Sequence, residues 1–243
     1  MYNTIPSYKP LKSRCAFPGD EEAPMVYFFN PTGLLGQIQM ELDWKMYDFC
    51  RLQQIIHGHI AENEKAIDVF VEQHKEQLAS ADENSMMYVR AREQIHAQSS
   101  SNSQTYQFSN QMTVIGLWAI AEQTMGFVYK KMCFHINGTQ ESDVKVPYRF
   151  NDFNKEFAKL GITLSTLDSF QDADECRTLN NTIKHGHKIE GHIVEFPYFS
   201  PLNGKLILEV DFELQRYVTG VIQFLSSLIE QGNKVLDPSH PTH

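Results

Sequence analysis

Hydrophobic residues recur at helical spacing along most of the chain. Residues 34–60 predict a long helix with an aromatic-rich face, and residues 60–78 continue as a second helical stretch. A more polar helix is expected over about residues 83–98. Residues 1–33 are rich in proline and predict an extended arm that covers a surface or stays mobile.

A Ser/Asn-rich run at residues 98–104, with the sequence QSSSNSQ, interrupts this pattern. Such a composition is typical of a flexible connection, which we place at residues 99–104. It divides the chain into accessory helices over residues 34–98 and a helical core over residues 105–236. Residues 237–243 are expected to form a tail.

The core begins with a helix over residues 105–134 that is apolar nearly all round between Met112 and Ala121. This pattern predicts the central buried helix of a bundle. Glu122 follows the apolar block, at a point where a carboxylate is costly unless it has a partner. Two alternatives stay open for Glu122: a paired position in the bundle, or rotation of the side chain to solvent.

The remainder of the core continues this helical pattern with one interruption. A short helix is expected at residues 151–160, and a longer helix at about residues 165–185, where Gly186 is a natural stop. Residues 191–210 alternate in polarity and contain Asn203-Gly204, which favours a β-hairpin or an extended excursion. The last helix, residues 214–231, has the clearest periodicity. The predicted fold class is mainly α: a helical bundle with a small β-hairpin excursion before the last helix.

The charge balance restricts the partners that the whole surface can attract. The chain has 21 Lys plus Arg against 30 Asp plus Glu, and a formal net charge of −9. This excludes generic DNA binding, so a nucleic acid has to be drawn in by a local basic cleft. The chain has no apolar run long enough to span a membrane and no secretory signal, which predicts a cytoplasmic protein that does not enter membranes. The four cysteines form no CxxC pair and are expected to be reduced thiols.

Candidate chemistry concentrates on the helix expected at residues 165–185. At about 100° per residue, its polar side chains fall within an arc of roughly 80° and form one stripe. The members of this stripe are Asp174, Arg177, Asn181 and His185. Arginine can hold a phosphate in a fork of donors, and histidine can move a proton. Together they are a plausible metal-free set of groups for RNA cleavage.

Residues 179–186, with the sequence LNNTIKHG, resemble the signature helix of HEPN domains. The resemblance extends to the layout of residues 105–231, with a long buried helix before the motif and an amphipathic helix after it. It implies an all-α domain that is commonly dimeric, with two motifs facing a shared cleft. In many members that domain is a metal-independent ribonuclease of toxin–antitoxin or antiviral systems.

The match departs from the family pattern at the arginine. If Asn181 and His185 align with the family's Asn and His, Asn180 occupies the arginine position and supplies no positive charge. Arg177 lies three residues earlier, which makes the spacing Arg-x7-His, longer than the usual range. Two hypotheses follow. Either the active site is shifted or catalysis is lost.

In the shifted site, Arg177 would clamp a phosphate, His185 would be the general acid and base, and Asn181 would orient the substrate by a hydrogen bond. Glu122 or Asp174 would set the charge of the Arg–His pair. Asn180 and Lys184 are the other supporting residues of this site. No cofactor is expected.

In the second hypothesis the chain is a non-catalytic HEPN-like interaction protein that forms a homodimer. Its accessory half would bind a protein partner, with RNA as the other partner considered. A weaker alternative is a transition-metal site at His185, His187 and His192, where a His-x-His pair in an extended chain supplies two ligands.

Overall fold

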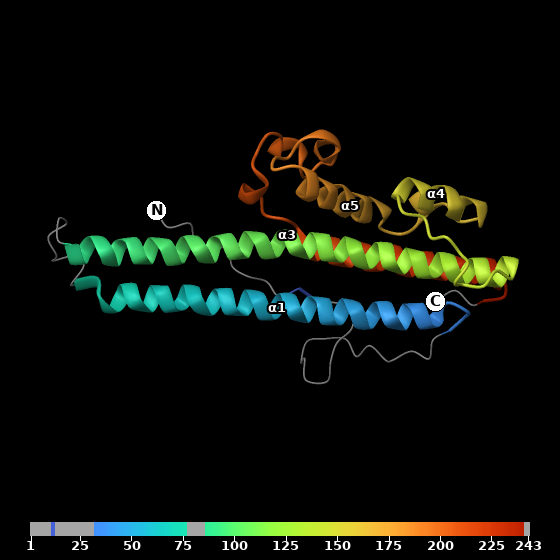
Figure 1. Ribbon diagram of the computed structural model, residues 1–243, viewed down its shortest axis with the longest axis horizontal. Coiled ribbons are helices and arrows are strands. Elements are labelled where there is room, and N and C mark those ends of the chain that lie inside the picture. The colour runs from blue at the N-terminus through green and yellow to red at the C-terminus, as the bar shows by residue number, and fades with distance from the viewer. Residues whose placement is uncertain (1–10, 13–31, 77–85, 241–243) are drawn as a thin grey trace.

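The structure, a computed structural model, describes residues 11–12, 32–76 and 86–240. In these ranges the chain is mainly α-helical, which confirms the predicted helical bundle, and it has no β-strand (Figure 1). Five α-helices are described. They are α1 (Gly36–Gln73), α3 (Met86–Asn137), α4 (Phe150–Lys159), α5 (Phe170–His185) and α6 (Leu214–Leu236).

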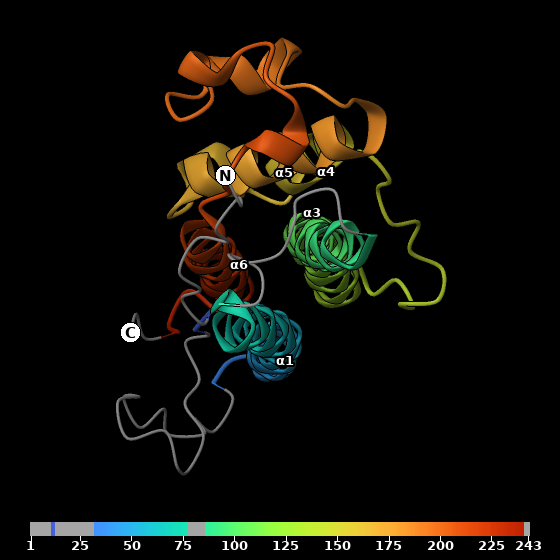
Figure 2. The ribbon, with the colours of Figure 1, turned by 90° about the vertical axis from the view of Figure 1, so that its left-hand side faces the viewer.

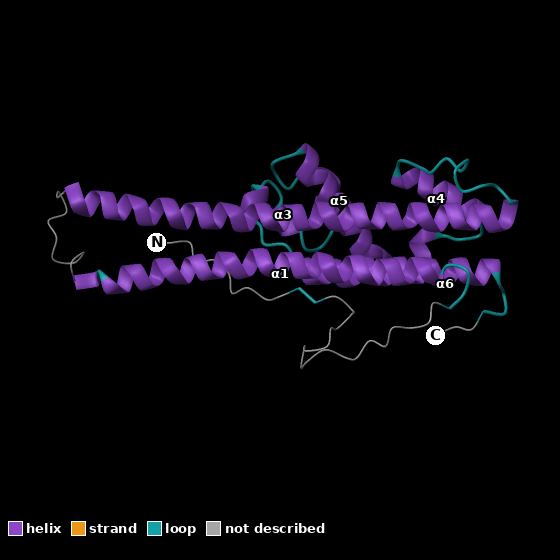
Figure 3. Cartoon of the chain, turned by 60° about the horizontal axis from the view of Figure 1, so that its bottom comes forward, coloured by secondary structure: helices purple, strands orange, loops and turns teal. Residues whose placement is uncertain are grey.

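The helices form two layers (Figure 2). The first layer is a three-helix bundle in which α1 and α3 run antiparallel and α6 lies alongside both. The second layer consists of α4 and α5, which follow one another over the bundle, and of short 3-10 turns beyond α5. Figure 3 shows that helix accounts for nearly all the regular structure of the described residues.

The core lies where α1, α3, α5 and α6 meet. More than half of the residues of α6 are buried, and Tyr217, Val221, Phe224 and Leu228 are fully enclosed. Helix α6 continues to Leu236, beyond the expected end at Gln231-Gly232. The expected stop was wrong because Gly232 permits a close approach: a Cβ there would lie 2.5 Å from Leu35 Cδ1.

The expected flexible connection at residues 99–104 is also wrong, since these residues lie inside the 52-residue helix α3. Their polar side chains are used to join α3 to α1. Asn102 Nδ2 donates to the carbonyl oxygen of Ile60, at 3.0 Å, and to Glu64 Oε2, at 2.9 Å. These contacts offset the low helix propensity of the Ser/Asn run. The expected boundary between accessory helices and core therefore falls within one continuous helix.

The two helical stretches expected at residues 34–78 are one helix as far as Gln73. Residues 77–85, which include the end of the second stretch and the start of the helix expected at 83–98, lie outside the described residues. The same is true of most of the expected N-terminal arm. Its described part includes Leu11, which is buried, and Lys12, which is exposed. The backbone N–H of Lys12 donates to Gln215 Oε1 of α6 at 2.7 Å.

The expected β-hairpin at residues 191–210 is not formed. The segment folds as three short 3-10 helices, at 191–195, 200–202 and 207–209. One isolated antiparallel bridge joins Lys188 and Leu206. Pro197 and Pro201 cannot donate to a β-ladder, which favours turns over strands. These turns pack against α5 and against one another, with buried apolar side chains at Ile193, Phe199 and Ile207.

Helix α4 forms at Phe150–Lys159, as expected. Helix α5 begins at Phe170, several residues later than expected, because Ser169 has left-handed backbone geometry with φ of 53°. Its side chain is held by α6, since Ser169 Oγ donates to Gln223 Oε1 at 2.5 Å. The expected end of α5 is confirmed: the helix ends at His185, and Gly186 is its extended C-cap.

Candidate functional site

The predicted polar stripe lies on α5, which presents two different faces. Ala173, Cys176 and Leu179 are buried and fix the helix to the bundle. The stripe faces outward. Asp174 and Arg177 are partly buried, whereas Asn181 and His185 are exposed. The four residues share one face of the helix, as the 3.6-residue period predicts, and this face is open to solvent mainly at its C-terminal end.

Arg177 is held by its own helix and by an aromatic ring. Its Nε donates to Asp174 Oδ1 at 2.7 Å, and Nη2 donates to Thr178 Oγ1 at 3.3 Å. The guanidinium lies over the ring of Phe150, 5.0 Å from the centroid. The side chain of Arg177 is 26% exposed. Its charge is thus balanced by Asp174, and one face of the guanidinium plane is covered by Phe150.

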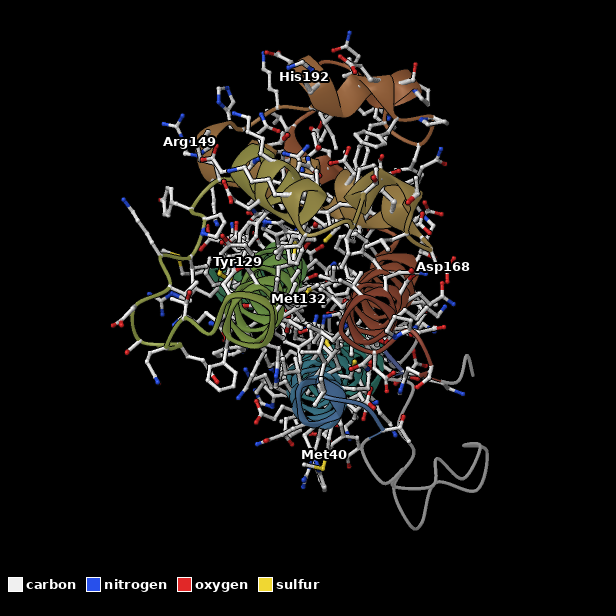
Figure 4. All side chains as sticks on the ribbon, turned by 90° about the vertical axis from the view of Figure 1, so that its right-hand side faces the viewer. Met40, Tyr129, Met132, Arg149, Asp168 and His192 are labelled. Carbon is white, nitrogen blue, oxygen red and sulfur yellow. The ribbon has the colours of Figure 1, made fainter. Side chains whose placement is uncertain are left out.

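Contacts with two other aromatic rings hold Phe150 in place at the start of α4. Its ring makes an edge contact with Trp118 of α3 at 5.7 Å and stacks with Phe170 of α5 at 6.4 Å. The cluster joins three helices beside Arg177. Figure 4 shows Arg149, the residue before Phe150, at the outer edge of the same layer.

Glu122 is not the counterion of Arg177. Its Oε1 accepts a hydrogen bond from Trp118 Nε1, one turn earlier in α3, at 2.9 Å, and the residue is exposed. Both open alternatives hold in part, since the carboxylate has a partner and also faces solvent. Asp174 is the acidic residue that balances the charge of Arg177.

The other predicted residues lie toward the C-terminal end of α5. Lys184 and His185 are exposed, and Asn180 is 1% exposed. Asn180 Nδ2 donates to Asn181 Oδ1 at 3.2 Å, while Asn180 Oδ1 has no hydrogen-bond partner. The buried Asn180 therefore faces the protein interior, and the exposed Asn181 is the amide of this pair that a ligand could reach.

Arg177 and His185 are well separated along the helix. Eight residues at 1.5 Å per residue place their backbones about 12 Å apart along the axis. Arg177 also bends toward Asp174, the residue one turn closer to the N-terminus, and so away from His185. The two side chains share a face of α5 but do not converge on one reacting atom within the chain.

The histidines expected to bind a metal are not brought together. His185, His187 and His192 are all exposed, and His192 Nδ1 lies 3.0 Å from Glu195 Oε1. Figure 4 shows His192 at the outer end of the second layer. Among the residues that the structure describes, no group of three or more His, Cys, Asp or Glu side chains could hold a metal ion.

The strongest polar cluster was not predicted from the sequence. Glu175, on the inner side of α5, is 4% exposed and forms a salt bridge with Arg216 of α6. Arg216 Nη1 also donates to Asp172 Oδ1 at 2.5 Å, and Tyr217 Oη donates to Glu175 Oε1 at 2.7 Å. The available signal was Glu175 itself, because it flanks Leu179 on the buried face and a carboxylate there requires a partner.

The cluster is built for packing two helices. Gly220 lets α6 approach α5, since a Cβ there would lie 2.4 Å from Asp172 Cβ. Burial, followed by the nearby carboxylate of Glu175, raises the pKa of the Tyr217 hydroxyl. Tyr217 therefore stays protonated and donates to Glu175, and the cluster fastens α5 to α6.

Two further predictions concern the redox state of the cysteines and the absence of a membrane-spanning segment. Cys50, Cys133 and Cys176 are free and buried. Burial raises the pKa of the Cys50 thiol to about 12, so it stays protonated at neutral pH. No helix in the described part of the chain is long and apolar enough to cross a membrane.

No protein-family model, curated protein or solved structure matches this chain. The resemblance to HEPN domains therefore stays a prediction that depends on residues 179–186 and on the layout of the helices around them.

Proposed function

We propose that this chain is a catalytically degenerate, HEPN-like interaction protein that binds a protein partner through its helices. The single observation that carries the proposal is the state of Arg177, whose guanidinium binds Asp174 and lies over Phe150. A phosphate clamp requires an arginine whose paired donors face the substrate. Here Asp174 accepts from Nε and Thr178 accepts from Nη2, so the Nε–Nη2 edge of the guanidinium is already occupied.

The position of His185 supports the same proposal. General acid–base catalysis needs the proton-transfer group within hydrogen-bond reach of the reacting oxygen, and a phosphate clamp needs contact with the same phosphate. The backbones of Arg177 and His185 are about 12 Å apart along the axis, and Arg177 turns toward Asp174, so the two side chains do not face one scissile bond in one chain. Asn180, at the position of the family's arginine, is buried and carries no charge.

The direct test is an RNA cleavage assay in EDTA with tRNA and total RNA as substrates. Wild type, Arg177→Ala, His185→Ala and His187→Ala are compared, and His187 serves as the matched control because it is another exposed histidine two residues away. We expect no cleavage above the protein-free blank from any of the four. Cleavage by wild type and His187→Ala that both other variants abolish would overturn the proposal.

A metal-independent ribonuclease of a toxin or antiviral type is the second candidate. The observation that favours it is the basic end of α5, where Lys184, His185 and Lys188 are all exposed. Such a spot could contact a phosphate on a chain whose net charge is −9. Catalysis would then need Arg177 and His185 from different chains, and the assay above would detect it.

A further inference from the structure

The outer side of α3 carries apolar residues at coiled-coil spacing. Phe108 is 61% exposed and Met112 is 40% exposed, while Ile115 and Ala119 are half-buried. We call these four residues the outer strip of α3. Their spacing of four, three and four residues is the repeat that packs one helix along another.

Helix α1 carries a further exposed apolar residue at the level of the outer strip. Ser109 Oγ donates to Gln53 Oε1 at 3.1 Å, and Gly116 lies against the ring of Phe49. These two contacts show which residues of the antiparallel helices α1 and α3 lie at the same level along their axes. Leu52, which is 58% exposed, falls between these levels. Leu52 thus adds exposed apolar surface on α1 at the level of the outer strip, beyond the four residues of α3.

The outer strip of α3 lies within the longest stretch of the sequence that has no Asp, Glu, Lys or Arg. Between Glu93 and Glu122 the chain has no Asp, Glu, Lys or Arg, although its net charge is −9. These residues correspond to about 42 Å of helix. The outer flanks of the strip carry glutamine, serine and threonine, as at Gln104, Thr105 and Gln111.

We propose that a second copy of this chain docks on the outer strip of α3, with the two α3 helices antiparallel about a two-fold axis. A two-fold interface puts the same patch against itself, so it needs a patch that does not repel its own charge. On an acidic chain the stretch between Glu93 and Glu122 meets that requirement. A basic partner would instead be drawn to acidic residues such as Glu62, Asp68 and Glu72 on α1.

The side chains of the strip suit close helix packing. Phe108 and Met112 can enter the spaces between residues of the facing α3, and the small side chain of Ala119 lets the two backbones approach. The inference names the partner of the proposed interaction protein and rests on that proposed function.

Sedimentation equilibrium of the full chain tests the inference. We expect wild type to reach twice the 28.0 kDa mass of one chain and to go no further, because a two-fold interface is closed. Met112→Glu should weaken the dimer at least tenfold. The matched control is Met40→Glu, since Met40 is also 40% exposed but lies on the outer side of α1, away from α3 (Figure 4).

Salt provides a second, independent readout. Screening reduces the repulsion between two acidic chains without weakening apolar contacts, so raising the salt from about 0.05 to 0.5 M should strengthen the dimer. Circular dichroism of both variants checks that they fold. If Met112→Glu does not fold, Phe108→Ser replaces it as the variant that disrupts the strip.

Several outcomes would overturn the inference: a monomeric wild type, an open series of larger oligomers, equal effects of the Met112 and Met40 variants, or dimerisation that salt weakens. A dimer that survives Met112→Glu and is broken by Lys184→Ala with His185→Ala would place the interface on α5 instead. RNA cleavage abolished by both Arg177→Ala and His185→Ala would overturn the proposed function and leave the sedimentation result intact, so the two failures are distinguishable.

Discussion

The two halves of α3 belong to one helix but have different neighbours. The inward residues of the C-terminal half are apolar and almost fully enclosed, namely Val114, Leu117, Ala121, Met125, Val128 and Met132. In Figure 4, Met132 lies between α3 and α6. The inward residues of the N-terminal half are mostly polar and face α1, namely Ser99, Asn102, Ser109, Asn110 and Thr113. We call this second set the polar seam, and it also includes Gln53 and His57 of α1.

The difference shows how one helix can have a strong end and a weak end. Burying a large apolar side chain contributes about 1.5–3 kcal/mol, whereas a neutral hydrogen bond contributes about 1 kcal/mol net. Beyond the seam, α1 and α3 continue as a two-helix hairpin without α5 or α6 beside them (Figure 1). We therefore expect local opening at the hairpin end before the bundle end unfolds.

The largest expected effect lies at the bundle end. Arg216→Met removes the positive charge paired with Glu175 and leaves the buried carboxylate with only the hydrogen bond from Tyr217, which should lower the free energy of unfolding by about 3–5 kcal/mol. Urea unfolding at neutral pH measures the loss. Arg177→Met is the matched control, because it removes an arginine of similar exposure whose partner Asp174 can still reach solvent. Equal losses in the two variants would contradict a special role for the Glu175–Arg216 pair.

A smaller effect is expected at the polar seam. Asn102→Ala removes two hydrogen bonds between α3 and α1 and leaves the Ile60 carbonyl without that donor, which should cost about 1–3 kcal/mol. Hydrogen exchange followed by mass spectrometry should show the loss in peptides from residues 86–113 and little change in residues 114–137. Ser101→Ala, on the exposed side of the same run, is the control. Uniform deprotection along α3 would show that its two halves do not open separately.

The smallest effect is a pH dependence of the polar seam. Burial lowers the pKa of His57 from its ordinary value of 6.5, although a hydrogen bond with Asn110 opposes the shift. The unfolded chain therefore binds the proton more readily, so stability present above pH 6.5 is lost as the pH falls through the lowered pKa. His57 packs between Gln53 and the ring of Tyr106, with no carboxylate among these neighbours.

Hydrogen exchange of residues 99–113 at about pH 7.5 and about pH 5.5, corrected for intrinsic rates, measures this dependence. His57→Gln, which cannot gain a charge, should remove most of it. A pH dependence that the substitution leaves unchanged would assign it to other histidines.

Periodicity in the sequence was sufficient to locate the helices but not to locate all of their ends. The apolar spacing of α6 and the Gly186 stop of α5 follow from local rules and were predicted. Continuity of α3 through residues 98–104 was not, because it depends on Asn102 reaching Ile60, a residue 42 positions away. Composition describes the propensity of a segment and does not reveal the helix that will lie beside it.

The candidate site shows the same limit. Helical geometry was enough to place Asp174, Arg177, Asn181 and His185 on one outward face. Asp174, the partner of Arg177, was among the predicted residues. The ring of Phe150 belongs to α4, and no pattern in the sequence indicated that it would cover Arg177. The Glu175–Arg216 pair joins positions 41 residues apart, so only the unexplained carboxylate on a buried face pointed toward it.

The position of α6 has a consequence for synthesis of the chain. Leu35, just before α1, has its backbone N–H bound to Asn233 Oδ1 at 2.8 Å, so the first described helix completes its contacts only with the last one. While the ribosome is still making residues 214–236, the apolar faces of α1, α3 and α5 have no third partner. A premature stop before Leu214 should therefore yield an aggregating product that chaperones retain, and not a smaller folded protein.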